Sequence, residues 1–217
     1  MKKKILCLHG YSMDELWLEE WCRPFEALIE GAELVIPRAP IVVPEKEVRA
    51  MAQRFGMAVP EVRIGEDKNW CWYRATEEKP PTYQYIEQSL QMLENLFAEH
   101  GEFDGVLGWS QGTVMTGILS ALNVKEQGKR FRFKWAVLCG GFRPGDLRFK
   151  SYYDEPINLP SLHVIGERES EFMRKQGALL ADCFVDAETL HTPVGHIMPI
   201  KYPEYMEKIA QWMEGQS

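Results

Sequence analysis

The chain contains 217 residues, a length that predicts one domain spanning residues 1–217. Its 45% hydrophobic and 26% charged residues are typical of a globular protein and exclude disorder of the whole chain. The 25 basic and 32 acidic residues give a net charge of −7, which repels phosphate backbones, so we expect no nucleic-acid partner. We also expect no membrane span, because no apolar run has the ~18 residues that cross a bilayer.

The N-terminus and the cysteines predict a cytoplasmic protein. The apolar run that follows three lysines ends at His9 and Gly10, short of the ~7–15 residues of a secretory signal. The five cysteines are odd in number and widely spread, and no Cys-x-x-Cys pair occurs. We therefore expect reduced thiols, no metal and no organic cofactor, while the sequence leaves the oligomeric state open.

Apolar runs alternate with amphipathic stretches along most of the chain. The runs predict strands over residues 4–9, 34–37, 103–109, 133–139, 162–165 and 183–190. The amphipathic stretches predict helices over residues 16–30, 83–99, 113–122, 171–183 and 203–213. This order is typical of an α/β fold, with a mostly parallel sheet of about six strands, helices on both faces and no separate cap domain.

Residues 38–82 interrupt this alternation. The segment holds five of the 13 prolines and the aromatic cluster Trp70-Cys71-Trp72-Tyr73, and no clean βα unit can be drawn in it. Connections in α/β folds usually have only ~2–6 residues. We interpret the segment as an irregular insertion and a candidate lid over a substrate; a loop without catalytic consequence is the alternative.

Gly108-Trp109-Ser110-Gln111-Gly112 matches the pattern G-x-S-x-G. Alone the pattern is weak, but here it follows an apolar strand and opens a helix, as a nucleophile elbow requires. The tight turn leaves no room for side chains at the two glycines and holds the serine in a strained conformation. Ser110 is therefore the predicted nucleophile.

A nucleophilic serine needs a base, and the chain offers five histidines. His100 follows a helix, His163 lies within a strand and His191 ends one, so each has a structural explanation. His9 lies in the first βα turn and can support the site. His196 lies in the loop between the last strand and the last helix, where an α/β-hydrolase carries its catalytic histidine, and is the predicted base.

The third member of such a triad follows a strand between the serine and the histidine. The loop after the predicted strand at 162–165 contains no aspartate. Glu169, three residues after Gly166, is the predicted acid. Glu171 is the alternative, and Glu167 ranks third.

The oxyanion of an acyl-transfer reaction needs two backbone donors. One is expected to be the N–H of Gln111, the residue after the nucleophile. Tyr11, in the loop after the first strand, is the best-placed second donor. Backbone donors leave little trace in side-chain identity, so this assignment depends on position alone.

Seven short motifs run nearly from end to end of the chain: Leu8-His9-Gly10-Tyr11, Pro37-Arg38-Ala39-Pro40, Trp70-Cys71-Trp72-Tyr73, Gly108-Trp109-Ser110-Gln111-Gly112, Gly140-Gly141-Phe142-Arg143-Pro144, His163-Val164-Ile165-Gly166 and Gly195-His196-x-x-Pro199. Their order and spacing resemble the family serine hydrolases (FSH family). The resemblance implies a compact α/β-hydrolase fold and a Ser–acid–His triad that acts on small-molecule carboxylic esters or thioesters. It also implies medium or long acyl chains, or thioesters held on a carrier.

The chain departs from the family at the acid, which is ordinarily an aspartate where this sequence has Glu169. The extra methylene requires a retracted backbone, or Glu171 reaches the histidine instead. As substrate pocket we assign the aromatic residues of two motifs, with hydrophobic plugs beneath a loop as an equal alternative: Trp70, Trp72, Tyr73 and Phe142.

Two rival interpretations remain. One is the related phospholipase and carboxylesterase group, which includes the acyl-protein thioesterases; the tryptophan cluster and the motif at 140–144 favour the FSH family instead. The other is a ligand-binding module that keeps the fold and has lost turnover.

Overall fold

The computed structural model describes residues 3–55, 63–65 and 68–216. Its main sheet has six parallel strands in the order β10-β9-β8-β7-β1-β2. The strands are β1 (Lys3–Leu8), β2 (Ala32–Val35), β7 (Gly105–Trp109), β8 (Trp135–Cys139), β9 (Ser161–Gly166) and β10 (Glu188–Thr192). The predicted parallel sheet of about six strands is confirmed.

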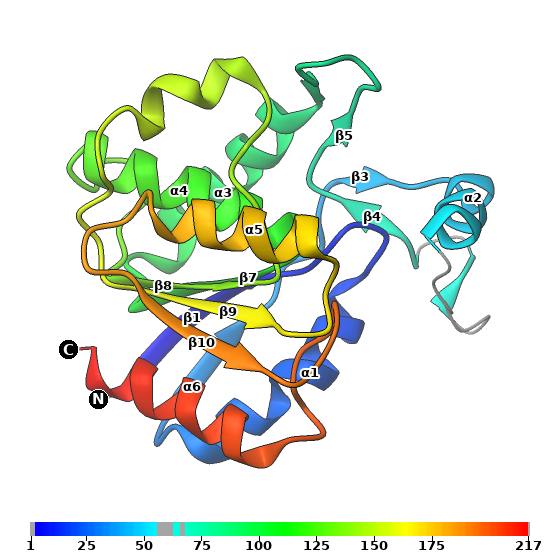
Figure 1. Ribbon diagram of the computed structural model, residues 1–217. Helices are drawn as coiled ribbons and strands as arrows, with labels where there is room; N and C mark the ends of the chain where they lie inside the picture. The colour runs from blue at the N-terminus through cyan, green and yellow to red at the C-terminus, as the bar shows by residue number, and fades with distance from the viewer. Residues whose placement is uncertain (1–2, 56–62, 66–67, 217) are drawn as a thin grey trace.

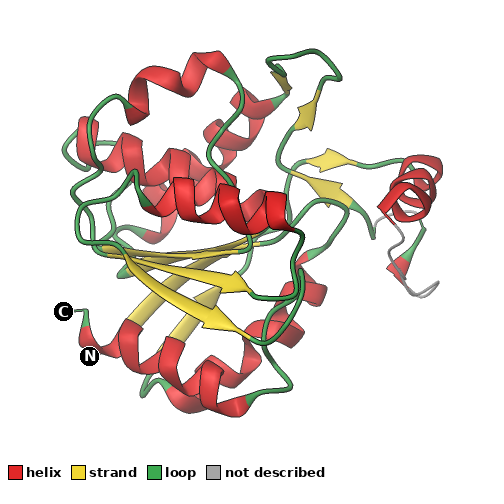
Figure 2. Ribbon diagram, in the orientation of Figure 1, coloured by secondary structure: helices red, strands yellow, loops and turns green. Residues whose placement is uncertain are grey.

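Helices cover both faces of this sheet (Figures 1 and 2). One face carries α1 (Glu15–Leu28) and α6 (Pro203–Gly215). The other carries α3 (Ile86–His100), α4 (Gln111–Lys125), α5 (Glu171–Ala181) and the 3₁₀ helix η2 (Leu147–Tyr153). In the described part of the chain, no helix is long and apolar enough to cross a membrane.

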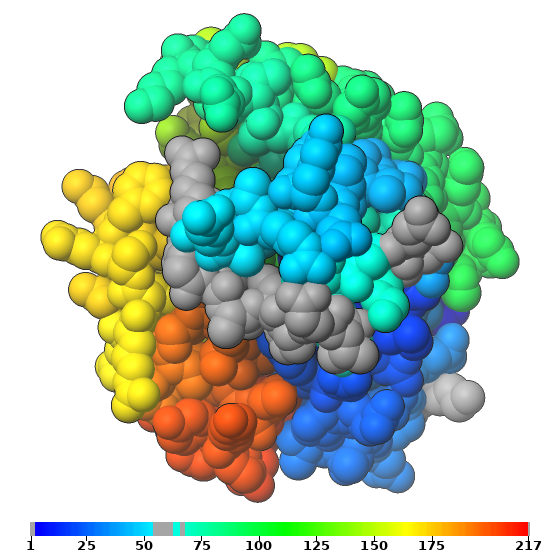
Figure 3. Space-filling model, turned by 90° about the vertical axis from the view of Figure 1, so that its right-hand side faces the viewer, coloured from blue at the N-terminus to red at the C-terminus, as the bar shows by residue number. Residues whose placement is uncertain are grey.

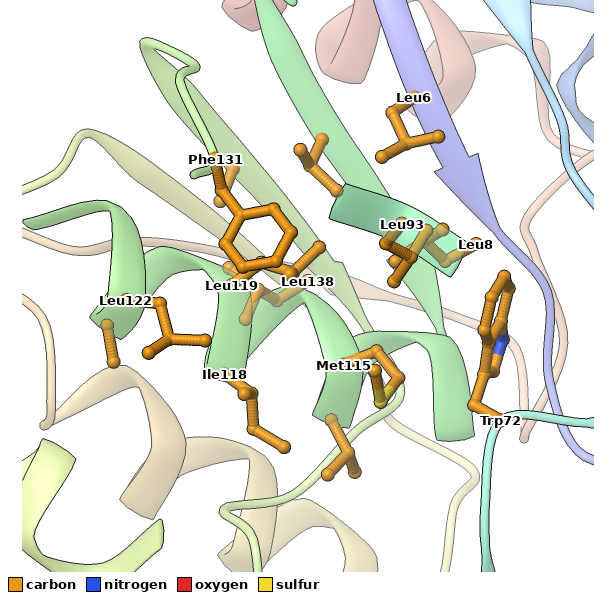
Figure 4. Packing of buried hydrophobic residues seen from close by; sticks show 14 of the residues in the cluster. Leu6, Leu8, Trp72, Leu93, Met115, Ile118, Leu119, Leu122, Phe131 and Leu138 are labelled. Carbon is orange, nitrogen blue, oxygen red and sulfur yellow. The ribbon is translucent and has the colours of Figure 1, made fainter. Parts of the chain in front are cut away.

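The four inner strands, β1, β7, β8 and β9, are largely apolar on both sides because both sides are covered. In β1, Leu6 and Leu8 face the core beneath α3 and α4, which Figure 4 shows from close by. Ile5 and Cys7 point the other way, into the core beneath α1 and α6. This two-residue alternation divides the interior into two hydrophobic clusters, one on each side of the sheet.

Segment 38–82 is more ordered than the sequence suggested. It contains helix α2 (Glu45–Phe55), which the sequence analysis missed, and the short strands β3 (Ile41–Val42), β4 (Trp70–Cys71) and β5 (Arg74–Ala75). β3 pairs with β4, and β5 pairs with β6 (Tyr83–Gln84), both antiparallel. Two-residue strands give no periodic signal, so the segment appeared irregular. Residues 56–62 and 66–67 of this candidate lid lie outside the described residues.

Two predicted boundaries are wrong. The strand predicted at 183–190 lies instead at Glu188–Thr192, because residues 183–184 continue the turn that ends α5 and Asp186 has a left-handed φ of 51°. The helix predicted from residue 83 begins at Ile86, since residues 83–84 pair as a strand and Tyr85 has a φ of 65°.

The carboxyl ends of the six strands meet on one side of the molecule, which Figure 3 turns toward the viewer. Residues 38–55 lie across the centre of this face, between α1, α5 and the segment around residues 190–200. Ser110, Glu169 and His196 each follow one of these strand ends, at β7, β9 and β10.

Candidate active site

Ser110 lies between the last residue of β7 and the first residue of α4. Its backbone has φ 55° and ψ −112°, a conformation that costs roughly 1–3 kcal/mol for a residue with a side chain. Its hydroxyl makes no capping bond to α4, although serine often caps helices. The side chain therefore points away from the helix, and the strained backbone is the one expected at a nucleophile elbow.

Close packing explains the two glycines of the elbow. A Cβ on Gly112 would lie 2.0 Å from the carbonyl oxygen of Leu8, at the end of β1. A Cβ on Gly108 would lie 2.4 Å from the carbonyl oxygen of Gly112. Both contacts are with backbone that cannot move aside, so the elbow accepts only glycine at these positions.

Ser110, His196 and Glu169 form a continuous hydrogen-bonded chain. Nε2 of His196 lies 2.9 Å from the Ser110 hydroxyl, and Nδ1 of His196 lies 2.7 Å from Oε1 of Glu169. Within the pair, the side chain of Glu169 is 3% exposed and that of His196 is 31% exposed. The carboxylate is thus shielded from solvent, whereas a substrate can reach the imidazole.

The loops that carry the acid and the base are bonded directly to each other. The N–H of Glu167 donates to the carbonyl of Thr192 at 2.8 Å, and the N–H of Arg168 donates to that of Val194 at 2.9 Å. The guanidinium of Arg174 also donates to the Glu169 carbonyl at 2.8 Å. These bonds fix the position of Glu169 relative to the histidine loop.

The two alternative acids lie elsewhere. Glu167 is exposed, and Glu171 is exposed in the first turn of α5. Of the three acidic residues considered in the sequence, the structure places Glu169 against His196, and its catalytic role stays a prediction.

Gly140 makes room for the longer acid, a role that the sequence analysis missed. Its φ is +57°, and a Cβ there would lie 3.0 Å from Oε1 of Glu169 and 3.2 Å from Nδ1 of His196. The bare backbone at the end of β8 therefore lets the glutamate carboxylate and the imidazole lie against it. The glycine pair at 140–141 was the available signal in the sequence.

The two expected oxyanion donors lie at the ends of neighbouring strands. Gln111 is the first residue of α4, whose first N–H groups have no acceptor within the helix. Tyr11 lies in the loop that follows β1, the strand beside β7. Both positions fit the expectation from the sequence.

His9 fixes the peptide plane next to Tyr11. Its Nε2 accepts a hydrogen bond from the N–H of Ala39 at 3.0 Å, so its proton is on Nδ1, which lies 2.8 Å from the carbonyl oxygen of Gly10. Burial lowers the pKa of His9 to about 4, which keeps the ring neutral. In a trans peptide the Gly10 carbonyl and the Tyr11 N–H point in opposite directions, so fixing the first directs the second.

The Gln111 side chain joins the elbow to segment 38–82. Its Oε1 accepts from the N–H of Trp72 at 2.7 Å, and its Nε2 donates to the carbonyl of Tyr73 at 2.8 Å. The Trp72 indole N–H in turn donates to the carbonyl of His9 at 2.8 Å. The sequence analysis assigned Gln111 only a backbone role, since such buried pairings are not visible in a sequence.

The expected aromatic pocket is only partly supported. Trp72 is fully buried beside His9, and Tyr73 is buried in a stack with Tyr83 at 3.9 Å between ring centroids. These two side chains pack in the core and do not line an open pocket in this structure. Trp70 and Phe142 are half-buried and remain candidates. In the described residues, no group of three or more His, Cys, Asp or Glu side chains is arranged to hold a metal.

A doubly covered parallel sheet, with an elbow serine and a hydrogen-bonded histidine and carboxylate at its carboxyl edge, defines the α/β-hydrolase class. A profile of the serine hydrolase (FSH1) family matches residues 1–208. The chain belongs to this family and is a hydrolase of the esterase type. The family resemblance seen in the sequence motifs is confirmed.

Curated relatives and solved structures agree with this assignment. Esterase OVCA2 of Xenopus tropicalis is 31% identical over 210 residues, which cover 93% of this chain and 88% of the relative. Esterase OVCA2 of Homo sapiens is 30% identical over 224 residues and covers 97% of each chain. The crystal structure of Zea mays acyl-protein thioesterase 2 has a TM-score of 0.67 and 18% identity, over 99% of this chain and 94% of that one, and shares the fold.

Proposed function

We propose that this chain hydrolyses carboxylic esters or thioesters through an acyl-enzyme formed on Ser110. The observation that carries the proposal is the hydrogen-bonded chain from Ser110 through His196 to Glu169, with distances of 2.9 and 2.7 Å. Both distances lie in the range in which a base takes a proton from a nucleophile and an acid orients the base.

In the first step the Ser110 oxygen attacks the substrate carbonyl while Nε2 of His196 takes the hydroxyl proton. Glu169 accepts the hydrogen bond from Nδ1 and stabilises the imidazolium that forms. The imidazolium then gives its proton to the departing alkoxide or thiolate, which leaves as an alcohol or thiol. The products of this step are the acyl-enzyme and a neutral base.

The negative charge of the tetrahedral intermediate is held by the N–H groups of Tyr11 and Gln111. His9 fixes the Gly10–Tyr11 peptide plane, and the N-terminus of α4 adds the favourable end of its dipole. Water then enters the site and gives its proton to His196. The water oxygen attacks the acyl carbon, and the bond to Ser110 breaks as the imidazolium gives the proton to the serine oxygen, which releases the carboxylic acid and restores both the hydroxyl and the neutral base.

We infer an acyl substrate of medium or long chain. Ile197 follows His196 directly and is 50% exposed, and Phe172, in the first turn of the helix after Glu169, is 67% exposed. Half-buried Trp70 and Phe142 add apolar surface. Exposed apolar side chains that closely follow the triad residues in the chain favour a ligand that is apolar along most of its length. Residues 38–55 cross the same face and are a candidate cover for the bound chain.

The test is covalent labelling with a fluorophosphonate, followed by turnover of p-nitrophenyl esters and matching thioesters of increasing acyl length. We expect a label on Ser110 in the wild type, none in Ser110→Ala, and a fall in kcat of at least about 10⁴-fold in that variant. Preference between the oxygen and sulfur series identifies the leaving group.

Folding of both proteins is checked by circular dichroism. A wild-type protein that is folded, unlabelled and inactive on both substrate series is a ligand-binding module, and the proposal then fails.

A further inference from the structure

The imidazole of His196 lies against the indole of Trp109. The ring centroids are 4.9 Å apart and the ring planes are inclined at 40°. Trp109 occupies the first variable position of G-x-S-x-G. It immediately precedes Ser110, the residue to which His196 is hydrogen-bonded. The proposed mechanism gives this tryptophan no role.

Trp109 is itself held firmly. It is 7% exposed, and the ring of Trp21 in α1 meets it edge-on at 4.9 Å and 87°. On another side its ring packs against Gly10, where a Cβ would lie 2.4 Å from the indole Cζ3. A side chain fixed by a helix, by the β1–α1 loop and by its own strand cannot turn away from the histidine.

The two hydrogen bonds of His196 do not fix the tilt of its imidazole ring. Ser110 and Glu169 hydrogen-bond its two nitrogens and define the line through them, whereas tilt of the ring about that line, through small changes in χ1 and χ2, is limited by packing. The Gly140 backbone and the Trp109 indole lie against the imidazole and oppose this tilt. The face of an indole also attracts a cation within about 6 Å, and His196 carries a positive charge once it has taken the serine proton.

We propose that Trp109 is the positioning residue of His196, whose indole holds the plane of the imidazole and stabilises the imidazolium during acyl transfer. The inference rests on the proposed function, since it takes His196 as the base. It assigns the elbow three consecutive roles: Trp109 supports the base, Ser110 attacks and Gln111 donates to the oxyanion. Stabilisation that arises only when charge develops lowers the barrier without tightening substrate binding.

The test compares Trp109→Leu and Trp109→Phe with Trp135→Leu. Trp135 is a matched control because it is fully buried in the same hydrophobic cluster on the neighbouring strand β8 and has its own edge-on partner, Trp212, at 6.1 Å. All variants are checked by circular dichroism and thermal melting, and kcat, KM and the pH profile of kcat/KM are measured on one p-nitrophenyl ester.

We expect Trp109→Leu to lower kcat roughly 10-fold with KM within about twofold, because the loss falls on the transition state. Its apolar side chain keeps the site dry while removing the indole face, so the acidic limb of the profile moves to lower pH by a few tenths of a unit. Trp109→Phe restores most of both losses. Trp135→Leu lowers the melting temperature but leaves kcat within about twofold.

Two outcomes overturn the inference while the proposed function stands. One is a Trp109→Leu enzyme whose kcat and pH profile match those of Trp135→Leu at equal melting temperature. The other is a Phe variant no better than the Leu variant. If Trp109→Leu does not fold, the comparison of wild type with Trp109→Phe decides: an unchanged kcat and profile reject the role. A wild type without turnover or labelling rejects the proposed function instead.

Discussion

The nucleophile elbow and segment 38–82 meet at the same edge of the sheet but are built in opposite ways. From β7 into α4, every residue of Gly105–Trp109 and nearly all of α4 are buried. The described residues of segment 38–82 include two-residue strands and helix α2, and polar bonds from His9 and Gln111 hold its backbone beside the elbow. The first region is fixed by continuous packing, whereas the second combines a few buried side chains, Trp72 and Tyr73 among them, with directional hydrogen bonds.

The two kinds of construction suit two different roles, holding the triad and covering it. Ser110, Glu169 and His196 each follow a strand of the six-stranded sheet. Displacement of that sheet would disturb the hydrophobic clusters on its two sides. The covering segment is joined by a few directional bonds and by the buried side chains of Trp72 and Tyr73, so the rest of its sequence can change while the triad keeps its geometry. Substitutions in the elbow should therefore cost more than substitutions at the joint, and the following predictions test that order.

The largest effect is expected for Gly112→Ala. The added Cβ would lie 2.0 Å from the Leu8 carbonyl oxygen, and neither β1 nor α4 can shift without breaking the sheet core. We expect a loss of roughly 3 kcal/mol or more in the free energy of unfolding, or failure to fold, measured by urea denaturation.

Gly215→Ala is the control for this change. It adds the same methyl group where nothing lies within 4 Å and should change stability by less than about 0.5 kcal/mol. Equal stability of Gly112→Ala and wild type would contradict the tight packing of the elbow.

The next largest effect is expected for Glu169→Gln, and it falls on kcat. The amide cannot stabilise the imidazolium, and its NH₂ group opposes the donor at Nδ1 of His196, so kcat should fall by about 10²–10⁴-fold. Glu171→Gln, two residues on and exposed, should stay within about twofold of wild type. Steady-state kinetics on one ester measures both, and equal losses would argue against a single acid.

The same contrast explains what could be predicted from the sequence. The apolar runs of β7, β8 and β9 and the glycine-bounded turn at Ser110 are local signals, so the sheet and the elbow follow from them. Glu169 and His196 followed from the order of strands, because parallel strands bring their carboxyl ends together.

The features that could not be predicted depend on residues that lie far apart in the sequence. β4 pairs with β3 about thirty residues away, and the side chain of Gln111 is bonded to the backbone of Trp72 and Tyr73. An aromatic cluster reveals that its members are apolar but not whether they face a ligand or the core, so the sequence left both alternatives open for Trp72 and Tyr73. α2 was missed because its many polar residues leave only a narrow apolar stripe.

Stability should also fall in mild acid, because two buried histidines stay neutral in the folded protein. Burial lowers the pKa values of His9 and of His163 to about 4, whereas an unfolded chain titrates near 6.5. Above pH 6.5 neither state binds the extra proton. Between pH 6.5 and 4 only the unfolded state binds it, so the free energy of unfolding decreases as the pH falls, by about 2 kcal/mol per histidine at pH 5.

Urea denaturation at pH 7, 6 and 5 measures this loss. His163→Gln removes the histidine within the sheet while its amide keeps a polar group near Ser161, which lies 3.2 Å from Nε2 of the native ring. This variant should lose about half of the histidine-dependent change and keep the half that belongs to His9. A pH dependence identical to that of wild type would show that His163 is not the group responsible.

The smallest effect is expected at the joint itself, for Gln111→Ala. The change leaves the backbone N–H of residue 111 in place as an oxyanion donor but removes the partners of the Trp72 N–H and the Tyr73 carbonyl. Unpaired buried backbone groups cost about 1–3 kcal/mol, which should appear as lost stability, with kcat reduced less than about 10-fold. Gln91→Ala, which removes an exposed amide paired with Asn95, should cost less than about 0.5 kcal/mol. If Gln111→Ala is as stable as this control, the packing of Trp72 and Tyr73 holds the segment without the Gln111 bonds. If its kcat falls as far as that of Glu169→Gln, the joint belongs to the reacting machinery and the division between the two regions does not hold.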